Sequence, residues 1–155
     1  MKSLFTSLLV ILPLVLNGCY KRPSPIPFGE ANCDYCGSII ANPKFGAEML
    51  VKNNKNLFFD SFECLIRLRN SQKYNSSQII SNWVIDFSHP GELIYVPSAY
   101  FLKADRVKSP SGLNILAFAD ESDLESVLKK SGGEKMRLQQ VINYVKLMDS
   151  MVSLR

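Results

Sequence analysis

The stretch that decides the fold is Leu57-Phe58-Phe59-Asp60-Ser61-Phe62-Glu63-Cys64. Its three leading apolar residues, 57–59, favour a β-strand. Asp60, followed three residues later by Glu63, has the spacing of a helix capping box, in which two side chains satisfy amides at the start of a helix. The stretch therefore predicts a strand that ends at residue 59 and a helix that runs from Ser61 to about Arg69.

The same order, a strand followed by a capped helix, returns later in the chain. A predicted strand at 115–118 precedes Asp120 and Asp123, which repeat this spacing, and the helix continues to Lys130. The other expected strands lie near residues 39–40, 47–51, 83–87, 93–96 and 100–102. At least two strands precede each helix, so the pattern predicts an α+β fold in which two related β-β-α-type halves form one compact domain.

One further helix is predicted near the end of the chain. Gly132-Gly133 interrupts the helical sequence, and beyond it apolar residues recur at helical spacing from Leu138 to Val152. We place the halves at about 33–88 and 89–130 and the C-terminal helix at about 134–152. The folded domain is thus expected to cover residues 33–155.

Three cysteines are the residues best suited to carry chemistry. Cys33 and Cys36 form a Cys-x-x-Cys pair before the first predicted strands, and Cys64 lies on the first predicted helix. Thiolates are soft donors that select Cu(I), Zn(II) and similar ions. A turn at Gly37 would place two sulfur atoms on one side of the chain, and Cys64 would add a third if its helix packs beside them. Cys33, Cys36 and Cys64 are therefore the candidate metal ligands, with copper as Cu(I) suspected and zinc as the second candidate.

The same cysteines allow two other interpretations. In an oxidising compartment Cys33 and Cys36 would form a disulfide and leave Cys64 buried, as in a non-metal-binding structural or interaction lipoprotein. A thiol-disulfide oxidoreductase would need a Cys-x-x-Cys that opens a helix, whereas residues 39–43 favour a strand and a turn. The four-cysteine pattern of structural zinc sites is missing from the sequence. The residues alone leave the metal and disulfide interpretations open.

The sequence lacks the residue patterns that are typical of catalysis. His89 is the one histidine, and its place beside Pro90 predicts a solvated turn residue. A Ser-His-Asp set, a paired-carboxylate motif and a glycine-rich phosphate loop are all missing, so we expect that the chain is not an enzyme. The formal net charge is +4, and the basic residues are scattered, so we expect no nucleic-acid partner.

The first residues predict export and lipidation. Lys2 and the apolar run at 4–16 are typical of a secretion signal, and the run is shorter than the roughly 20 apolar residues that span a bilayer. It ends in Leu16-Asn17-Gly18-Cys19, which resembles the lipobox of bacterial lipoproteins and implies cleavage before Cys19 and acylation of Cys19. Residues 1–18 are then a lipoprotein signal peptide, and residues 19–32 a lipidated, proline-rich tether.

This assignment predicts an extracytoplasmic protein that is lipid-anchored to a bacterial membrane. Tyr20, and not aspartate, follows Cys19. In a Gram-negative organism this favours the outer membrane.

The order of these motifs is similar to that of the NosL family. The shared features are a lipobox cysteine, Cys-x-x-Cys-Gly at 33–37, Phe-Asp-x-x-x-Cys at 59–64, and the later segments 84–87, 99–101 and 112–120. The resemblance implies an α+β fold of two related halves. It also implies an extracytoplasmic copper-binding lipoprotein, a metallochaperone that acts as an accessory protein in assembling the copper sites of nitrous oxide reductase.

Three positions depart from the family pattern. The family usually has methionine directly after Cys-x-x-Cys-Gly, and here Ser38 follows. It usually has methionine before the later glycine and often histidine after it, where this chain has Ser111 and Leu113. A hydroxyl is a poor ligand for Cu(I), so the resemblance leaves two outcomes: metal held by the three thiols, or a NosL-like fold without copper.

Overall fold

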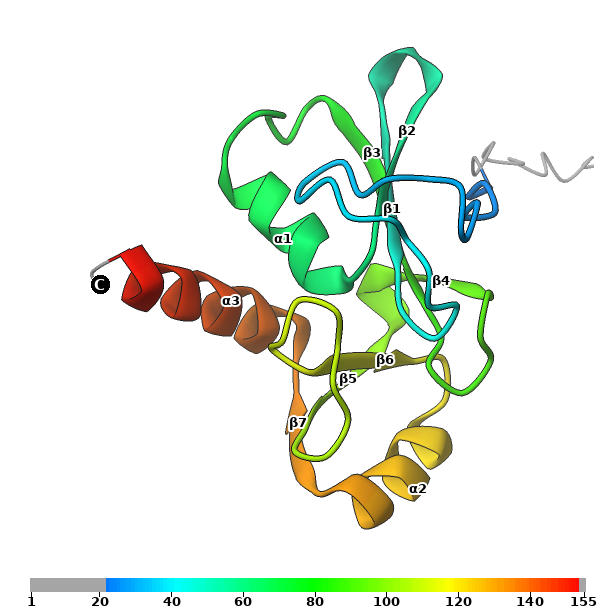
Figure 1. Ribbon diagram of the computed structural model, residues 1–155, viewed down its shortest axis with the longest axis vertical. Helices are drawn as coiled ribbons and strands as arrows, with labels where there is room; N and C mark the ends of the chain where they lie inside the picture. The colour runs from blue at the N-terminus through cyan, green and yellow to red at the C-terminus, as the bar shows by residue number, and fades with distance from the viewer. Residues whose placement is uncertain (1–21, 154–155) are drawn as a thin grey trace, which may run out of the picture.

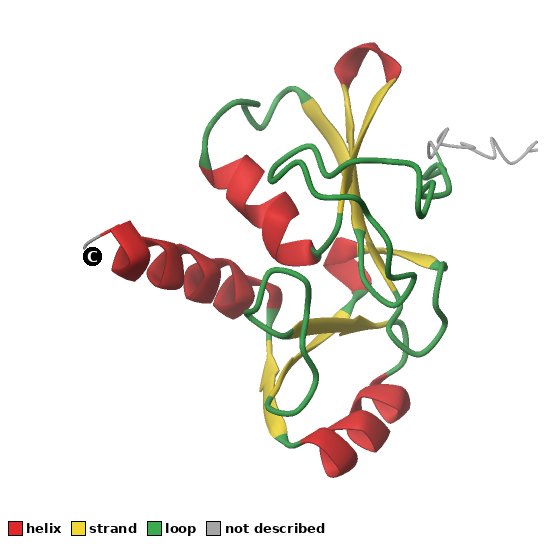
Figure 2. Ribbon diagram, in the orientation of Figure 1, coloured by secondary structure: helices red, strands yellow, loops and turns green. Residues whose placement is uncertain are grey.

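The computed structural model describes residues 22–153, which form two antiparallel sheets and three α-helices (Figures 1 and 2). The strand order is β2-β1-β3-β4 in the first sheet and β6-β5-β7 in the second. In chain order the elements are β1 (Ala47–Val51), η1 (Lys52–Asn54), β2 (Lys55–Phe59), α1 (Phe62–Asn70), β3 (Ile79–Ile85), β4 (Leu93–Tyr95), η2 (Val96–Ser98), β5 (Tyr100–Ala104), β6 (Ile115–Phe118), α2 (Glu121–Ser131), β7 (Gly133–Met136) and α3 (Leu138–Ser153). The predicted α+β class with a C-terminal helix is confirmed. The predicted signal peptide and Cys19 lie outside the described residues.

Each sheet is built around the same unit. β1 pairs antiparallel with both β2 and β3, and α1 connects β2 to β3. β5 likewise pairs antiparallel with β6 and β7, and α2 connects β6 to β7. The two halves are therefore two β-β-α-β units, to which β4 is added in the first sheet and α3 after the second.

The predicted start of the last helix, at about residue 134, is wrong. Residues 133–136 form strand β7, and the helix begins at Leu138. The strand contains no β-branched or aromatic residue, so local preference does not favour it. Pairing with β5, where Phe101 is the register partner of Met136, decides its conformation instead.

Most residues of β5 and β6 are buried, on both faces of the second sheet. Alternate residues of β5 and β6, among them Phe101 and Ala117, join the large core that contains the first sheet, α1 and α3. The residues between them, among them Leu102 and Phe118, form a smaller core with α2. A strand buried on both faces is expected to have a continuous apolar sequence, as residues 115–118 do.

The described part of the predicted tether is packed against the first sheet (Figure 1). Ile26 is only 5% exposed and belongs to the large core. The Ser24 amide donates to both carboxylate oxygens of Glu48, at 3.1 and 3.0 Å. The segment also forms a turn of its own, in which the Ala31 amide donates to the Pro27 carbonyl at 2.9 Å. Residues 24–32 thus belong to the folded domain, which begins before the predicted residue 33.

Helix α3 packs against α1 through its predicted apolar face. Val141 and Val145 are fully buried, and the Nε atom of Arg67 lies 2.9 Å from Oδ1 of Asp149. The predicted face does not extend to Val152, which is 73% exposed. Among the helices of residues 22–153, none combines the length and the apolar character needed to cross a bilayer.

The predicted capping box at the start of α1 is wrong. Ser61 is the N-cap, and its hydroxyl accepts from the Cys64 amide at 3.3 Å. Glu63 is fully buried and accepts from the Ser109 hydroxyl at 2.6 Å and from the Ile115 amide at 3.3 Å. Glu63 therefore joins α1 to the second unit and does not cap its own helix.

Alanine at Gly133 is expected to weaken the pairing of β7 with β5. A Cβ atom there would lie 2.1 Å from the Lys103 carbonyl oxygen of β5, and the φ angle of +127° disfavours any L side chain. Overpacking and backbone strain together should lower the free energy of unfolding by roughly 3 kcal/mol or more, measured by urea denaturation. Gly91→Ala is the control, because Gly91 has a φ angle of +90° but no atom within 4 Å of the added Cβ. Equal losses in the two variants would contradict the register of β7.

Glu63→Gln is expected to stabilise the protein at neutral pH. Burial raises the pKa of Glu63, so the folded state prefers the neutral acid. Wild-type stability should therefore fall as the pH rises above the carboxyl pKa of the unfolded chain, about 4.3. Glutamine keeps an acceptor for Ser109 and Ile115 and cannot ionise, so its advantage in urea denaturation should grow between about pH 4 and pH 7. The exposed Glu134→Gln is the control, and an advantage of Glu63→Gln that is independent of pH would show that the charge is not the cause.

Candidate metal centre

The Cys-x-x-Cys segment forms a closed loop. The Cys33 amide donates to the Ser38 carbonyl at 2.8 Å, and the Gly37 amide donates to the Cys33 carbonyl at 2.9 Å. Gly37 has a φ angle of +79°, a conformation that glycine adopts at little cost, as the predicted turn requires. Ile39 forms an isolated bridge with Asn32, so the predicted strand at 39–40 is wrong and these residues close the loop instead. The loop brings Cys33 and Cys36 together.

Asp34 attaches this loop to strand β2. Its amide donates to the Phe58 carbonyl, and its carboxylate accepts from the Phe58 amide, both at 2.8 Å. β2 is an edge strand, so its outer backbone groups are available to the loop. This role of Asp34 was not predicted from the sequence, although a short acidic side chain in a turn is a common backbone acceptor. The attachment places the loop beside the junction of β2 and α1.

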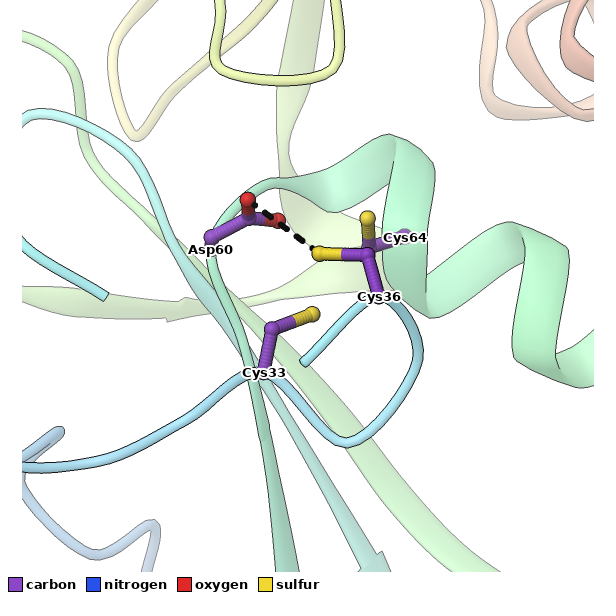
Figure 3. A group of neighbouring side chains, drawn as sticks. All are labelled: Cys33, Cys36, Asp60 and Cys64. Carbon is purple, nitrogen blue, oxygen red and sulfur yellow. Dashed lines mark hydrogen bonds between the residues drawn. The ribbon is translucent and has the colours of Figure 1, made fainter. Parts of the chain in front are cut away.

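Four side chains meet at that junction. One ligand atom from each of Cys33, Cys36, Asp60 and Cys64 lies within 4.8 Å of all the others. We call these four residues the thiol cluster. Figure 3 shows the three sulfur atoms gathered together, with the Asp60 carboxylate beside Cys36. The structure therefore brings together all three cysteines that the sequence predicted as metal ligands, and their role as ligands stays a prediction.

Asp60 is the member of the thiol cluster that sequence reasoning missed. Because Ser61 caps the helix, the Asp60 carboxylate is free to face the thiols, and its Oδ2 atom accepts from the Cys36 thiol at 3.6 Å. Its Oδ1 atom is buried and has no hydrogen-bond partner among residues 22–153. A buried carboxylate oxygen without a partner is unfavourable, and a bound cation would satisfy it.

The cysteines are free thiols that differ in exposure and in protonation. Cys33 and Cys64 are buried, and Cys36 is exposed. A hydrogen bond from the Cys64 thiol lowers the pKa of Cys33 to about 6, against the opposing effect of burial. The same hydrogen bond, together with burial, raises the pKa of Cys64. The two pKa values shift in opposite directions, so Cys33 is the member of this pair that loses its proton first.

Ser111 lies against the thiol cluster. Its hydroxyl is 3.2 Å from the Cys64 sulfur and 2.5 Å from the Ser61 hydroxyl. The position at which the family resemblance implies methionine therefore lies beside the Cys64 sulfur. Of the other two divergent positions, Ser38 is exposed, and Leu113 packs against the large core.

His89 lies outside the thiol cluster. Its side chain is 53% exposed, which agrees with the predicted turn residue, but its Nδ1 atom lies 3.0 Å from Oδ2 of the buried Asp86. The hydrogen bond to Asp86 raises the pKa of His89.

The donors of the thiol cluster suit a soft or borderline cation. Three sulfur atoms match the preference of Cu(I) for thiolates. Three sulfur atoms and one carboxylate oxygen also match the four-coordinate shell of Zn(II). Three of the four side chains are buried, and the exposed Cys36 leaves one side open to solvent or to a partner.

Comparison with known proteins agrees with this description. The sequence profile of the NosL family matches residues 27–145, well over half of the chain and a range that contains the whole thiol cluster. The fold is similar to the crystal structure of the copper chaperone NosL from Shewanella denitrificans, with a TM-score of 0.67 and 21% sequence identity; the match covers 76% of this chain and 94% of that chain. A search of curated proteins found no match. At this identity the structural likeness concerns the fold alone.

Metal affinity is expected to rise with pH. At neutral pH a metal ion must displace the proton of Cys64, and below about pH 6 it must also displace one from Cys33. The slope of log affinity against pH should therefore steepen by about one below this pH, as measured by titration against a competing chelator. In Cys64→Ala, Cys33 loses its donor, so its thiolate absorbance should appear at higher pH than in the wild type. A slope that stays constant across pH 6 would contradict the hydrogen bond between the Cys64 thiol and Cys33.

Proposed function

This chain belongs to the NosL family, and we propose that it is a metallochaperone-like lipoprotein that binds Cu(I) through Cys33, Cys36 and Cys64. The observation that carries the proposal is the meeting of these three sulfur atoms with the Asp60 carboxylate within 4.8 Å. The thiol cluster also lies within the segment that matches the family. Members of this family are not enzymes, in agreement with the sequence prediction.

The unequal exposure of the ligands suits binding and release. Cys33 and Cys64 are buried and would hold the ion, because their positions are set by the closed loop and by the first turn of α1. Cys36 is exposed and is the ligand that an incoming donor can reach. Asp60 accepts from the Cys36 thiol and so keeps this side chain over the other two sulfur atoms. Exchange of the metal would begin with replacement of Cys36 by a sulfur donor of the receiving protein.

Cu(I) is the metal that we propose, and Zn(II) is the second candidate. Ser111 takes the place of a methionine ligand, so Cu(I) would be held by thiolates without a thioether. A hydroxyl beside the Cys64 sulfur can donate to a thiolate and stabilise its charge. The buried oxygen of Asp60 favours Zn(II), which accepts carboxylate ligands more readily than Cu(I) does.

The location and the partner are proposed from the sequence. A signal peptide at 1–18 and an acylated Cys19 would anchor the protein outside the cytoplasm, at the outer membrane in a Gram-negative organism. Only residues 20–23 separate Cys19 from Ser24, which is fixed to Glu48. The domain would therefore lie close to the lipid surface. The proposed recipient is a copper enzyme such as nitrous oxide reductase.

We predict that the reduced mature chain binds Cu(I) tightly and that Cys33→Ser/Cys36→Ser loses this binding. Loss of two of the three sulfur donors should lower the affinity by about 100-fold or more. The measurement is an anaerobic Cu(I) titration against a competing chelator, and Ser38→Ala is the control, because Ser38 is exposed on the same loop.

Ser111→Met should raise the affinity for Cu(I) relative to Zn(II), since it adds a thioether beside Cys64.

A wild-type chain that takes up no Cu(I) would contradict the proposal. If it took up Zn(II) instead, with the same dependence on Cys33 and Cys36, the second metal would be the cargo. If it took up neither and contained a Cys33–Cys36 disulfide when isolated, the alternative of a structural or interaction lipoprotein would stand. Free-thiol counting on the protein as isolated distinguishes these outcomes.

A further inference from the structure

Two segments of the first unit carry basic residues without any acidic ones. Residues 49–59 and 64–85 contain no aspartate and no glutamate. Arg67 in the second segment pairs with Asp149 of α3, and the other basic residues of both segments are exposed. These exposed residues are Lys52, Lys55, Arg69 and Lys73. The exposed charge of the two segments is therefore entirely positive.

The fold places these four residues at one end of the first sheet. Lys52 and Lys55 lie at the turn that joins β1 to β2. The Lys52 amide donates to the Gln78 carbonyl at 2.8 Å, so the loop that leads from α1 to β3 adjoins this turn. Arg69 lies in the last turn of α1, and Lys73 lies in the loop itself. Figure 1 shows the turn and the loop at the end of the molecule that is remote from α2.

The tether runs towards the same end. Ile26 packs against Gly46, directly before β1, whereas the Ser24 hydroxyl accepts from the side-chain amide of Asn56, near the start of β2. Followed back towards the N-terminus, the tether thus approaches the turn between β1 and β2. Arg22, two residues before Ser24, is exposed. We call the five exposed basic residues the basic end: Arg22, Lys52, Lys55, Arg69 and Lys73.

The lipid anchor proposed at Cys19 would leave the domain beside the basic end. Only residues 20 and 21 separate Cys19 from Arg22. Three steps of fully extended chain span at most about 11 Å, so the acylated cysteine would lie within this distance of the Arg22 backbone. A domain held so close to a bilayer presents some of its surface to the lipid headgroups, and the surface nearest the anchor is basic.

Anionic phospholipid headgroups are the partner that this charge fits. Lysine and arginine side chains are attracted by the negative surface potential of a membrane that contains anionic lipids. A basic surface and a lipid anchor reinforce each other, because each keeps the other near the membrane. The basic end comes from three separate segments of the chain, so its charge suits a broad anionic surface.

We propose that the basic end docks on a membrane surface rich in anionic phospholipids and orients the domain there. The direction of docking rests on the lipid anchor of the proposed function. β2 begins at Lys55 in the basic end, and Asp60 of the thiol cluster follows its last residue. At the usual rise of a strand this separation is about 17 Å. The thiol cluster is thereby held away from the headgroups, with Cys36 accessible to a partner protein.

The test is co-sedimentation with vesicles of residues 19–155 carrying Cys19→Ser, so that no lipid is attached. Vesicles with equal amounts of phosphatidylglycerol and phosphatidylcholine should bind this protein. Vesicles of phosphatidylcholine alone should bind it at least about 10-fold more weakly, because their headgroups have no net charge. Raising the salt from about 50 to about 300 mM should weaken binding to the anionic vesicles, because dissolved ions screen exposed charges.

Two double variants with equal loss of charge locate the binding surface. Lys52→Gln/Lys55→Gln should weaken binding to the anionic vesicles by about 10-fold or more, because two charges of the basic end are lost. Lys129→Gln/Lys130→Gln removes two exposed charges from α2 and should bind like the wild type. The proposal is overturned if the unsubstituted protein binds both kinds of vesicle equally, or if the two double variants lose binding to the same extent.

Soluble polyanions test the other occupants of the basic end. Tighter binding of polyglutamate or of a short DNA duplex than of anionic vesicles, at the same salt, would indicate an acidic protein or a nucleic acid and would overturn the proposal. Cu(I) titration of Lys52→Gln/Lys55→Gln should match the wild type, because both lysines lie at the other end of β2 from Asp60. Failure of vesicle binding would therefore leave the metal function in place, and failure of Cu(I) binding would leave the vesicle result in place.

Discussion

The hydrogen bond from the Cys64 amide to the Ser61 hydroxyl determines where α1 begins, and the candidate metal centre depends on that position. With Ser61 as the cap, Asp60 stays outside the helix and presents its carboxylate to Cys36. Cys64 falls in the first turn, where it meets Cys33. If Asp60 were the cap, backbone amides would occupy its oxygen atoms. A difference of one residue in the start of the helix therefore decides whether this carboxylate serves the backbone or the thiol cluster.

The first turn of α1 also joins the two β-β-α-β units beside the metal centre. Glu63 points away from the thiols and holds Ser109 and the Ile115 amide of the second unit. The loop held in this way also carries Ser111, whose hydroxyl reaches the Cys64 sulfur. Asp60 and Cys64 of the thiol cluster belong to the first unit, whereas the Ser111 hydroxyl comes from the second. A buried carboxylate is unfavourable unless it is hydrogen-bonded, so the contacts of Glu63 tie the geometry of the site to the packing of both units.

Helix α1 separates two regions of opposite electrostatic character. Its N-terminal end carries the thiol cluster, and the positive end of a helix dipole stabilises a thiolate nearby. Its C-terminal end carries Arg69, which is exposed. The first region suits a soft cation held by anionic sulfur.

The sequence by itself determined the elements with strong local signals. Apolar runs followed by a helix start predicted the strand-helix junctions at residues 59–62 and 118–121, and Cys33, Cys36 and Cys64 were the candidate ligands because thiolates are soft donors. Tertiary structure decided what has no local signal. Strand β7 forms because β5 offers it a partner, and Ile26 is buried because the first sheet accepts it. Asp60 and Glu63 had the spacing of a capping box, yet contacts with Cys36 and Ser109 set their roles. The spacing of residues along the chain predicts contacts within one turn of a helix. The hydrogen-bond partner of a buried polar group depends instead on which residues tertiary packing places beside it.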